Sequence, residues 1–555
     1  MYLINDYLVV KILNIILNNL FPFGVVGEYQ FKRNINRFIG TISRVSKYWK
    51  NTFIKRLSLD NAIEIKRESN ISVDTVISLL ERGVKLQLNL HFFEKTKSTH
   101  EMIINRIANN ENQQTLSMLI ENDLSDFHNL SIPQRKIIIS STLINNTGFV
   151  NVENFLTIDS LEIRGENDMA LQDNHLPTLL KFKFLKHIKI YNVSCKLEFI
   201  IHWVTVVNPK SLKLMQSPYI TSNNNTPRFD SLLDAISAKC TEITELQIIH
   251  YSMLATRKCF EKLFEHASLE KLFISGLVSL DEEPSIAPQI NNQKLIWVGF
   301  GSIIDKNYYL RCWACQSRIQ KLSFTYFDMN ILKNHIAYLK SLDLGPLSVG
   351  SDLYEVISHN QSIEHLSIAS IDRQDVNAFF EALNRNKTLT SLAFGAEYRD
   401  KNNMYQRLDD CVIKLFQLQH PTIQKLKLTR LSKTIDYFQE AIQKNHTITN
   451  LEMSSSQCDF ETSIQTLVNI IEFNNSISTL KLAPFEFEPI NEQQLSNFTK
   501  ALQSNSSLSS LRILLNCRDQ PSEKAIQSSL TFTKYLSDLF TNKLINLQIE
   551  PSYGF

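Results

Sequence analysis

A short motif recurs in the C-terminal half of the chain, where apolar and polar positions alternate after a polar turn. Six segments share the pattern Asn-x-Ser/Thr-φ-x-x-Leu-x-φ, in which φ is apolar and x varies. Their central leucines are 25 to 34 residues apart and are Leu366, Leu392, Leu426, Leu451, Leu480 and Leu511. His420 replaces the Asn of the third segment, and the fifth, taken from Asn475, is one residue tighter at its start. A period of about 20 to 50 residues indicates a solenoid or a similar array.

Each repeat is expected to contain a helix, a turn and a strand. The Leu-x-φ end alternates as a half-buried strand does. The stretch before it has helical spacing, with Val376, Phe379, Phe380 and Leu383 on one face. The Asn between the two suits a left-handed helix C-cap, because its short polar side chain tolerates positive φ. No unit can bury both apolar faces alone, so stacked units must supply the core.

Looser copies of the strand pattern continue upstream and to the C-terminus. They centre on Leu161, Ile188, Leu246, Leu272, Val298, Leu322, Leu342 and Leu547. One more unit is expected around Leu212, with an insertion at 217–227. The alternative is that Leu-x-x-Leu-x-φ occurs by chance in an ordinary helical protein, but the regular spacing favours the array.

These repeats resemble the leucine-rich-repeat family, especially its longer ribonuclease-inhibitor-like class, over residues 150–555. The resemblance implies an α/β solenoid with parallel strands on the concave face and helices outside, preceded by a small helical N-terminal module. The family usually has an Asn three residues after the second strand hydrophobe, and here only Asn516 fits well. In the other repeats the position three residues after the second strand hydrophobe is occupied by Ile371, Glu397, Leu431, Ser456 or Phe485. The buried Asn ladder is therefore expected to be mostly missing, which puts regular curvature in doubt.

The N-terminal 60 residues have a different pattern. Ile4 to Leu13 and Phe38 to Lys50 look like two short amphipathic helices. Together they resemble the F-box, a fold that binds the adaptor Skp1 of cullin–RING ubiquitin ligases. The positions that match its apolar residues are Leu8, Ile12, Val45 and Trp49.

Two features depart from the F-box. Ile4-Asn5 replaces the usual Leu-Pro, and the linking stretch 21–37 is longer than typical. The alternative is a plain helical cap over the open end of the solenoid. The expected division is a module at 1–60, a linker with irregular first repeats at 61–150, which includes the strand-like Leu86 to Leu90, and the solenoid at 151–555.

Composition narrows the class of protein. With 555 residues the chain is too long for one compact core, and 43% hydrophobic with 21% charged residues is typical of a globular protein. A net charge of +2 gives the chain no general electrostatic attraction to nucleic acid or to an anionic membrane. Basic clusters at 181–189 and 425–433 are interpreted as solvated strand and loop positions. The apolar stretch 3–26 is interrupted by polar residues, which argues against a membrane span or a signal peptide.

No catalytic or metal-binding motif stands out. Cys312-Trp-Ala-Cys315 lacks a second ligand pair, and the remaining cysteines are scattered, which fits a cytoplasmic location and leaves a nuclear one open. Sequons at Asn386-Lys-Thr388 and Asn445-His-Thr447 lie inside the repeated turn and are interpreted as structural. We expect no enzyme activity, no cofactor and no metal; an enzyme or regulator built on Cys312 and Cys315 is the alternative.

Function is therefore expected on the strand face that points away from the core. Residues that flank the central hydrophobe lie on that face. The expected partner-binding residues are Tyr191, Phe273, Trp297, Lys427, Glu452, Lys481 and Arg512. The predicted function is a protein-binding repeat protein that serves as substrate-recognition subunit of a Skp1-type ubiquitin ligase, with a Skp1-like adaptor and an unidentified protein target as partners. The alternative is a scaffold or regulator outside the ubiquitin system.

Overall fold

The computed structural model divides the chain into two compact units. Unit 1 contains residues 1–18 and 35–320, and unit 2 contains 19–34 and 321–555. The structure describes most of 159–279, 292–301 and 318–516, the strands at 58–65, 85–92, 115–120, 136–139 and 546–552, and scattered residues among the first 84. In the described part of the chain, no helix is both long and apolar enough to span a membrane.

Unit 1 is built on parallel strands that pair in chain order, each with the next. They are β1 (Ser58–Ile65), β2 (Lys85–Phe92), β3 (Thr115–Ile120), β4 (Lys136–Ile139), β5 (Ser160–Arg164), β7 (His187–Tyr191), β9 (Ser211–Met215), β11 (Glu245–Ala255), β12 (Lys271–Ser279) and β13 (Trp297–Phe300). The strand expected at Leu86 to Leu90 is thus confirmed as part of β2, and the unit expected around Leu212 is confirmed as β9.

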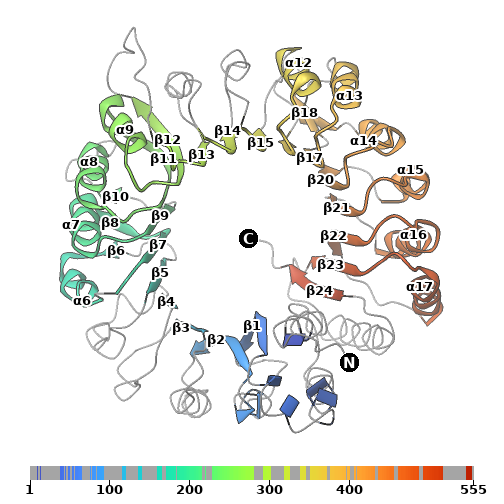
Figure 1. The fold of residues 1–555 in the computed structure, drawn as a ribbon, viewed down its shortest axis with the longest axis horizontal. Coiled ribbons are helices and arrows are strands. Elements are labelled where there is room, and N and C mark those ends of the chain that lie inside the picture. Colours follow the sequence, from blue (N-terminus) through green and yellow to red (C-terminus); the bar gives the residue numbers. More distant parts are fainter. Residues whose placement is uncertain are drawn as a thin grey trace. The chain divides into compact units, whose positions relative to one another are not determined.

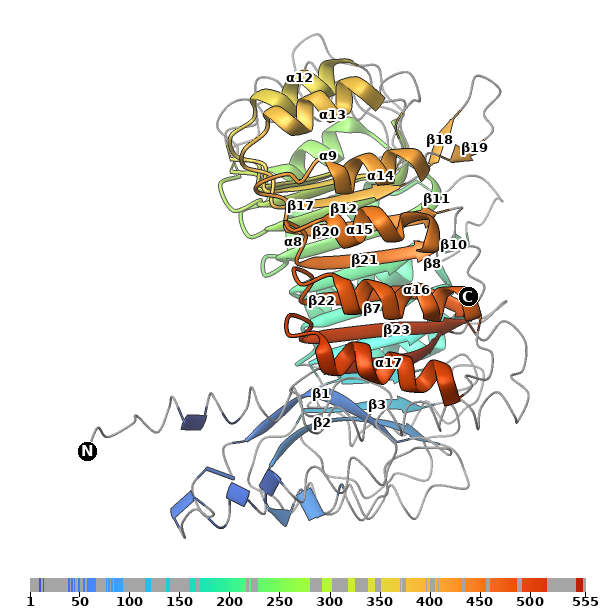
Figure 2. The same ribbon diagram turned by 90° about the vertical axis from the view of Figure 1, so that its right-hand side faces the viewer.

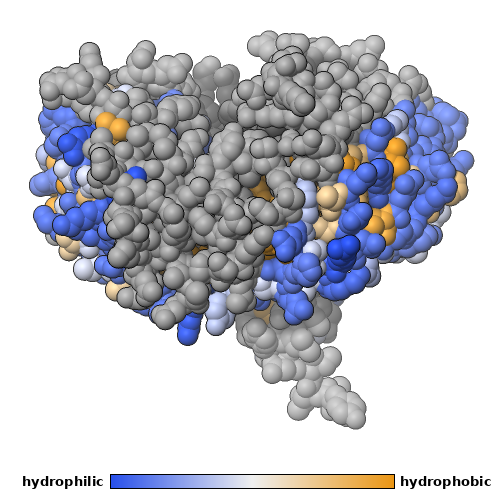
Figure 3. Space-filling view, turned by 90° about the horizontal axis from the view of Figure 1, so that it is seen from above, coloured by the Kyte–Doolittle hydropathy of each residue, from blue (hydrophilic) through white to orange (hydrophobic). Residues whose placement is uncertain are grey.

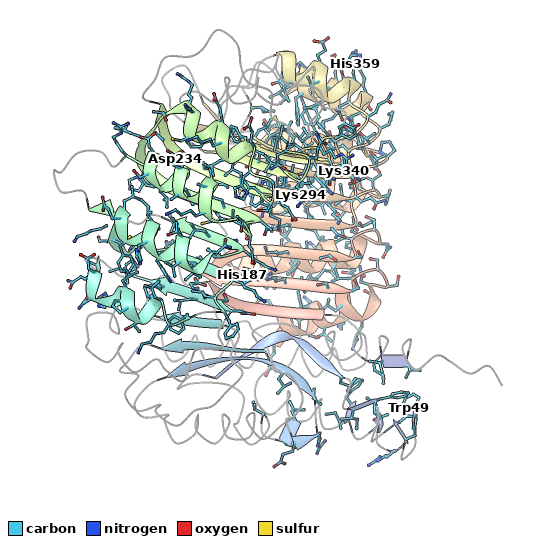
Figure 4. All side chains as sticks on the ribbon, turned by 60° about the vertical axis from the view of Figure 1, so that its left-hand side comes forward. Trp49, His187, Asp234, Lys294, Lys340 and His359 are labelled. Atoms are coloured by element: carbon cyan, nitrogen blue, oxygen red, sulfur yellow. The ribbon has the colours of Figure 1, made fainter. Side chains whose placement is uncertain are left out.

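Helices of unit 1 lie along one face of these strands (Figure 1). They are η6 (Asp173–His175), α6 (Leu176–Leu179), α7 (Leu197–Val207), α8 (Asp230–Lys239) and α9 (Arg257–Phe264). Neighbouring helices pack together, and Asp234 on α8, labelled in Figure 4, accepts a hydrogen bond from Lys262 on α9 at 2.6 Å. A small parallel sheet joins β6 (Ala170–Leu171), β8 (Ser194–Lys196) and β10 (Tyr219–Ile220).

Unit 2 repeats the same plan. Its parallel strands are β14 (Lys321–Phe324), β15 (Ser341–Leu344), β16 (His365–Ile368), β17 (Ser391–Gly395), β20 (Lys425–Leu431), β21 (Asn450–Ser455), β22 (Thr479–Glu486), β23 (Ser510–Asn516) and β24 (Asn546–Ser552). Its helices are α12 (Ser351–His359), α13 (Val376–Arg385), α14 (Asp409–Gln417), η8 (Ile435–Phe438), α15 (Gln439–Lys444), α16 (Phe460–Phe473) and α17 (Glu492–Ser504). Figure 2 shows α14 to α17 stacked in chain order beside β20 to β23. A hairpin of β18 (Glu397–Arg399) and β19 (Tyr405–Arg407) interrupts the pattern.

The strand register puts equivalent leucines side by side. Leu392 pairs with Leu426, Leu426 with Leu451, and so on to Leu511. Each of these side chains is at most 3% exposed, because it packs under the helices that cover one face of the sheet. Val376, Phe379 and Leu383 are buried from the helix side, as their spacing predicted. The expected α/β arrangement of parallel strands with helices along one face is confirmed within each unit.

Part of the N-terminal module is described. Ile39, Ile42, Phe53 and Ile54 are buried, and the ring of Trp49 meets that of Phe53 edge-on with centroids 5.0 Å apart. Trp49, labelled in Figure 4, is half-exposed. The other expected adaptor-binding residues, Leu8, Ile12 and Val45, lie outside the described residues.

The recurring Asn has a role that differs from the expected one. Its side chain is buried and joins each turn to the turn before it. In unit 2, Asn474 Nδ2 donates to the carbonyls of Ile442 at 2.7 Å and of Asn445 at 2.9 Å. Its Oδ1 accepts from the backbone N–H groups of Ser476 and Ile477, both at 2.9 Å. One side chain therefore satisfies four backbone groups in two successive repeats.

Equivalent residues form a series that we call the turn ladder. Asn386 and Asn505 donate to the carbonyls of Asn360 and Asn474, one repeat back, and Asn445 donates to that of Phe416. The members in unit 2 are Asn360, Asn386, His420, Asn445, Asn474 and Asn505, and in unit 1 they are Cys240, His266 and Asn292. Asn474, not Asn475, is the ladder residue of the fifth segment, so that segment has the same length as the others.

The turn ladder differs from the Asn ladder that was expected to be mostly missing after the strands. At that position Ile371 and Leu431 are buried apolar residues, and the buried Asn series found here lies at the turn before each strand. The left-handed C-cap expected at the repeated Asn fails at Asn445, where φ is −81°. Among the described residues other than glycine, positive φ occurs at Asn192, Asn208 and Gln419, and none of these is a ladder residue. The ladder residues do not need positive φ, because the side-chain amide itself satisfies the turn. Asn386 and Asn445 are each 2% exposed, which confirms the structural interpretation of the two sequons.

His420 shows which chemical property the ladder needs. Its Nε2 faces the carbonyls of Leu383 at 2.8 Å and Asn386 at 3.0 Å, so it must donate. Its Nδ1 accepts from the backbone N–H groups of Thr422 at 3.3 Å and Ile423 at 3.2 Å. A neutral imidazole protonated on Nε2 therefore copies the donor and acceptor of Asn. Burial lowers the pKa of His420, and the two carbonyls offset that effect only in part.

We expect His420→Asn to make stability less sensitive to acid. Because the pKa of His420 is lowered on folding, the unfolded chain binds a proton first, and the histidine's contribution to stability is lost as the pH falls below about 6.5. The Asn variant has no such proton to bind. Urea unfolding between pH 8 and pH 5 would measure the difference from the wild type, and His446→Asn, at an exposed neighbour, is the control. Equal pH dependence of the His420→Asn variant and the wild type would contradict the lowered pKa of His420 in the folded chain.

Candidate interaction surface

Each unit has one sheet face that no described helix covers, which we call its open face. The residues before and after each central hydrophobe lie on it, since side chains alternate along a strand. Six of the seven predicted partner-binding residues occupy such flanking positions, and Tyr191 lies on the same side of its strand two residues after Lys189. Phe273, Lys427, Glu452, Lys481 and Arg512 directly follow the central hydrophobe of their strands, Trp297 precedes one, and Tyr191 ends β7.

Ion pairs run along the open face of unit 1, from one strand to the next. Glu162 on β5 accepts from Arg164 Nε at 2.8 Å and from Lys189 Nζ of β7 at 2.9 Å. Burial alone would raise the pKa of Glu162, but the bonds and charges of Lys189 and Arg164 outweigh it and hold that pKa below its usual value. Glu162 was not predicted, because the repeat pattern gives the face of a residue and not its neighbour one strand away.

A second ion pair lies further along the same face. Lys213 on β9 meets Glu245 on β11 at 2.9 Å, and Ser211 donates to the other carboxylate oxygen at 2.8 Å. Burial again acts against ionisation, and Lys213 and Ser211 overcome it, so that the pKa of Glu245 is lowered. His187, labelled in Figure 4, begins β7 on this face. The carboxylates of Glu162 and Glu245 are therefore ionised at neutral pH. They act as negative charges on the surface and not as proton donors.

Two aromatic rings occupy the far strands of this face. The rings of Phe273 on β12 and Trp297 on β13 have centroids 6.4 Å apart. Gly299 follows the central Val298 of β13, and a Cβ there would lie 2.2 Å from Phe273 Cδ2. The Phe273 ring thus occupies the place of the missing side chain. The glycine lets the ring lie against the backbone, which forms an aromatic platform beside charged strands.

The open face of unit 2 carries the predicted charged residues side by side. Lys427, Glu452, Lys481 and Arg512 follow one another on β20, β21, β22 and β23 in register. Glu452 Oε1 lies 3.0 Å from Lys427 Nζ and 2.8 Å from Lys481 Nζ. Burial would raise the pKa of Glu452, but the two lysines prevail and lower it. The sequence placed all four residues on one face. In the structure Glu452 contacts Lys427 and Lys481, and Arg512 lies in register with Lys481.

No other chemistry is visible in the described residues. Burial raises the pKa of the Cys195 thiol to about 12 and that of the Cys240 thiol to about 11. Such thiols are protonated at neutral pH and are poor nucleophiles. The described residues contain no cluster of His, Cys, Asp and Glu suited to a metal ion. Cys312 and Cys315 lie outside the described residues, so their predicted inertness stays a prediction.

Figure 3 shows one face of the molecule, on which described hydrophobic side chains are visible among the hydrophilic ones. Scattered exposed hydrophobic residues are normal for a soluble protein. The charged and aromatic columns of the open faces are therefore the features that set these surfaces apart.

Comparison with known proteins adds one structural likeness. No protein-family model matches the sequence, and no curated protein matches it. Among solved structures, the chain is similar to an internalin from Listeria monocytogenes at 16% sequence identity, with a TM-score of 0.34. The match covers 64% of this chain and 93% of the internalin.

Proposed function

We propose that this chain is a binding protein whose open sheet faces recognise another protein. The observation that carries the proposal is the side-by-side arrangement of long charged and aromatic side chains on strands that no described helix covers. Parallel strands about 4.8 Å apart place these side chains within reach of a single partner. Aromatic and Arg side chains are the usual anchors of protein interfaces, and Trp297, Phe273 and Arg512 supply them.

We expect the triple variant Lys427→Ala, Lys481→Ala and Arg512→Ala to keep its fold and lose its partner. The three side chains reach solvent, so the melting temperature should change much less than in a core variant, although Glu452 loses the two lysines that hold it ionised. Affinity capture from a native extract, quantified by mass spectrometry, should lose the specific partner. The control is Lys414→Ala, Lys444→Ala and Lys500→Ala, which removes the same charge from exposed positions on α14, α15 and α17. If only the control variant loses the partner, the interface lies on the helices and not on the open face.

The finer part of the proposal is a substrate-recognition subunit of a Skp1-type ubiquitin ligase, with repeats of the ribonuclease-inhibitor-like class. A packed apolar cluster around Phe53, with Trp49 half-exposed beside it, supports a small helical module. Cys195, Cys240, Cys259 and Cys411 are buried and form no disulfide, which supports a cytoplasmic location. Co-precipitation of the full chain with Skp1, and its loss in Trp49→Ala, would support the ligase role. Failure of the wild-type chain to bind Skp1 would leave a scaffold with an N-terminal cap.

A further inference from the structure

We infer that the open face of unit 2 binds an acidic segment of the partner protein, in competition with its own Glu452. The inference rests on the proposed function and adds the chemistry of the ligand. Lys427, Lys481 and Arg512 form the cationic column, and Glu452 stands inside it as an internal counter-ion.

The geometry around Glu452 supports this competition. One oxygen, Oε1, receives both lysines, at 3.0 Å from Lys427 and 2.8 Å from Lys481. The lysine side chains are 49% and 26% exposed and that of Glu452 is 31% exposed, so a ligand can reach all three from solvent. A carboxylate that arrives from a partner would make the same contacts that Glu452 makes now.

The balance of charge on this face differs from that of the whole chain. The described flanking positions of β14 to β23 carry two carboxylates, Asp343 and Glu452, and five cations, which are Lys321, Lys425, Lys427, Lys481 and Arg512. The chain as a whole carries 58 Lys and Arg against 56 Asp and Glu. A local cationic excess on an otherwise balanced protein attracts anionic partners and speeds their association.

The position of Glu452 favours a peptide over a nucleic acid. The backbones of Lys427 and Lys481 are two strands apart, roughly 10 Å at about 4.8 Å per strand, but their Nζ atoms converge on one Glu452 oxygen, at 3.0 and 2.8 Å. A nucleic acid has a phosphate at every step and would place negative charge against Glu452. A peptide in the polyproline II conformation returns to the same side every third residue, after roughly 9 Å. One acidic residue can therefore take the place of the Glu452 carboxylate between the two lysines, while the neutral residues beside it bring no further negative charge to that point.

The test uses fluorescence anisotropy with a labelled twelve-residue peptide that repeats Glu-Pro-Pro and, for comparison, a labelled oligothymidylate of twelve nucleotides. With the full chain at low salt, Lys427→Gln and Lys481→Gln should each weaken peptide binding about threefold to tenfold. Glu452→Gln should tighten it by a similar factor, because it removes the competitor and keeps the shape. Added salt should shrink all three effects. Lys500→Gln on α17 is the matched control and should change nothing.

Several results would overturn the inference. They are no peptide binding at millimolar concentration, no gain of affinity in Glu452→Gln, or tighter binding of the oligothymidylate that responds to the same substitutions. Thermal melting of each variant shows whether the fold is kept. Ala393→Trp separates this inference from the proposed function, since it puts a neutral bulky group on the same face. If it blocks partner capture and the charge variants do not, the open face binds a partner but the acidic ligand is wrong. If neither affects capture, the proposed function fails for unit 2.

Discussion

Replacing Asn474 with Ala is expected to lower the free energy of unfolding by about 3–5 kcal/mol, as much as the loss of a core leucine. The methyl group removes the donor to the carbonyls of Ile442 and Asn445 and the acceptor for the N–H groups of Ser476 and Ile477. A buried polar group without a partner costs about 1–3 kcal/mol. The side chain is 2% exposed, so water cannot replace its bonds without opening the turn.

The chain supplies its own control at the next residue. Asn475 has the same side chain, but it is exposed, and Asn475→Ala should change stability by about 0.5 kcal/mol or less. Urea unfolding of the two variants, followed by circular dichroism, measures the contrast. If the two variants unfold at the same urea concentration, the turn ladder is not a main source of stability and the packing of the strands alone holds the repeats together.

Much of the fold could be predicted from the alternation around each central leucine. Leu392, Leu426 and Leu451 are buried in register because a strand with one buried face must place every second residue in the core. The same parity placed Lys427 and Arg512 on the open face. The rule needs only the local sequence, and it therefore held even in upstream strands such as β5, where the repeat pattern is loose.

The local sequence pattern could not distinguish between the two possible roles of the turn Asn. Helix C-caps and backbone-satisfying turns both favour Asn, and only the contact partner distinguishes them. That partner lies about one repeat away, as Asn445 does from Asn474. His420 at the third copy was the available signal, since histidine shares with Asn a side-chain donor and a side-chain acceptor. The Ser or Thr two residues later was a second signal, because Ser476 donates to the carbonyl of Asn445 at 3.0 Å.

Pairings on the candidate surface were missed for a related reason. Glu162 and Lys189 are 27 residues apart, and only the register of β5 against β7 brings them together. Periodicity assigns a residue to a face, but the neighbour across the sheet depends on the length of every intervening loop. Glu452 was placed on the face correctly, whereas its contact with two lysines needed the structure.

Leu451→Ala is expected to destabilise unit 2 by about 2–5 kcal/mol, through lost burial and the cavity left behind. Leu451 is 1% exposed and lies between Leu426 and Leu480 in the sheet, so its removal loosens both neighbouring repeats. Leu392→Ala should act in the same way around β17. Asn450→Ala, one residue away on the opposite face, is the control and should change stability by about 0.5 kcal/mol.

The effect of Leu451→Ala should also be local. In a repeat array each unit contacts only its neighbours, so a weakened repeat opens without the whole chain unfolding. Amide hydrogen exchange should accelerate most in β20, β21 and β22 and hardly at all in β15 and β16. Partner binding should weaken only in proportion to the fraction of the variant that is unfolded. Urea at a concentration below the unfolding transition of the wild type should therefore weaken binding by the variant further. Faster exchange spread evenly over all described strands would mean that unit 2 unfolds as one cooperative block and that the nearest-neighbour picture does not hold.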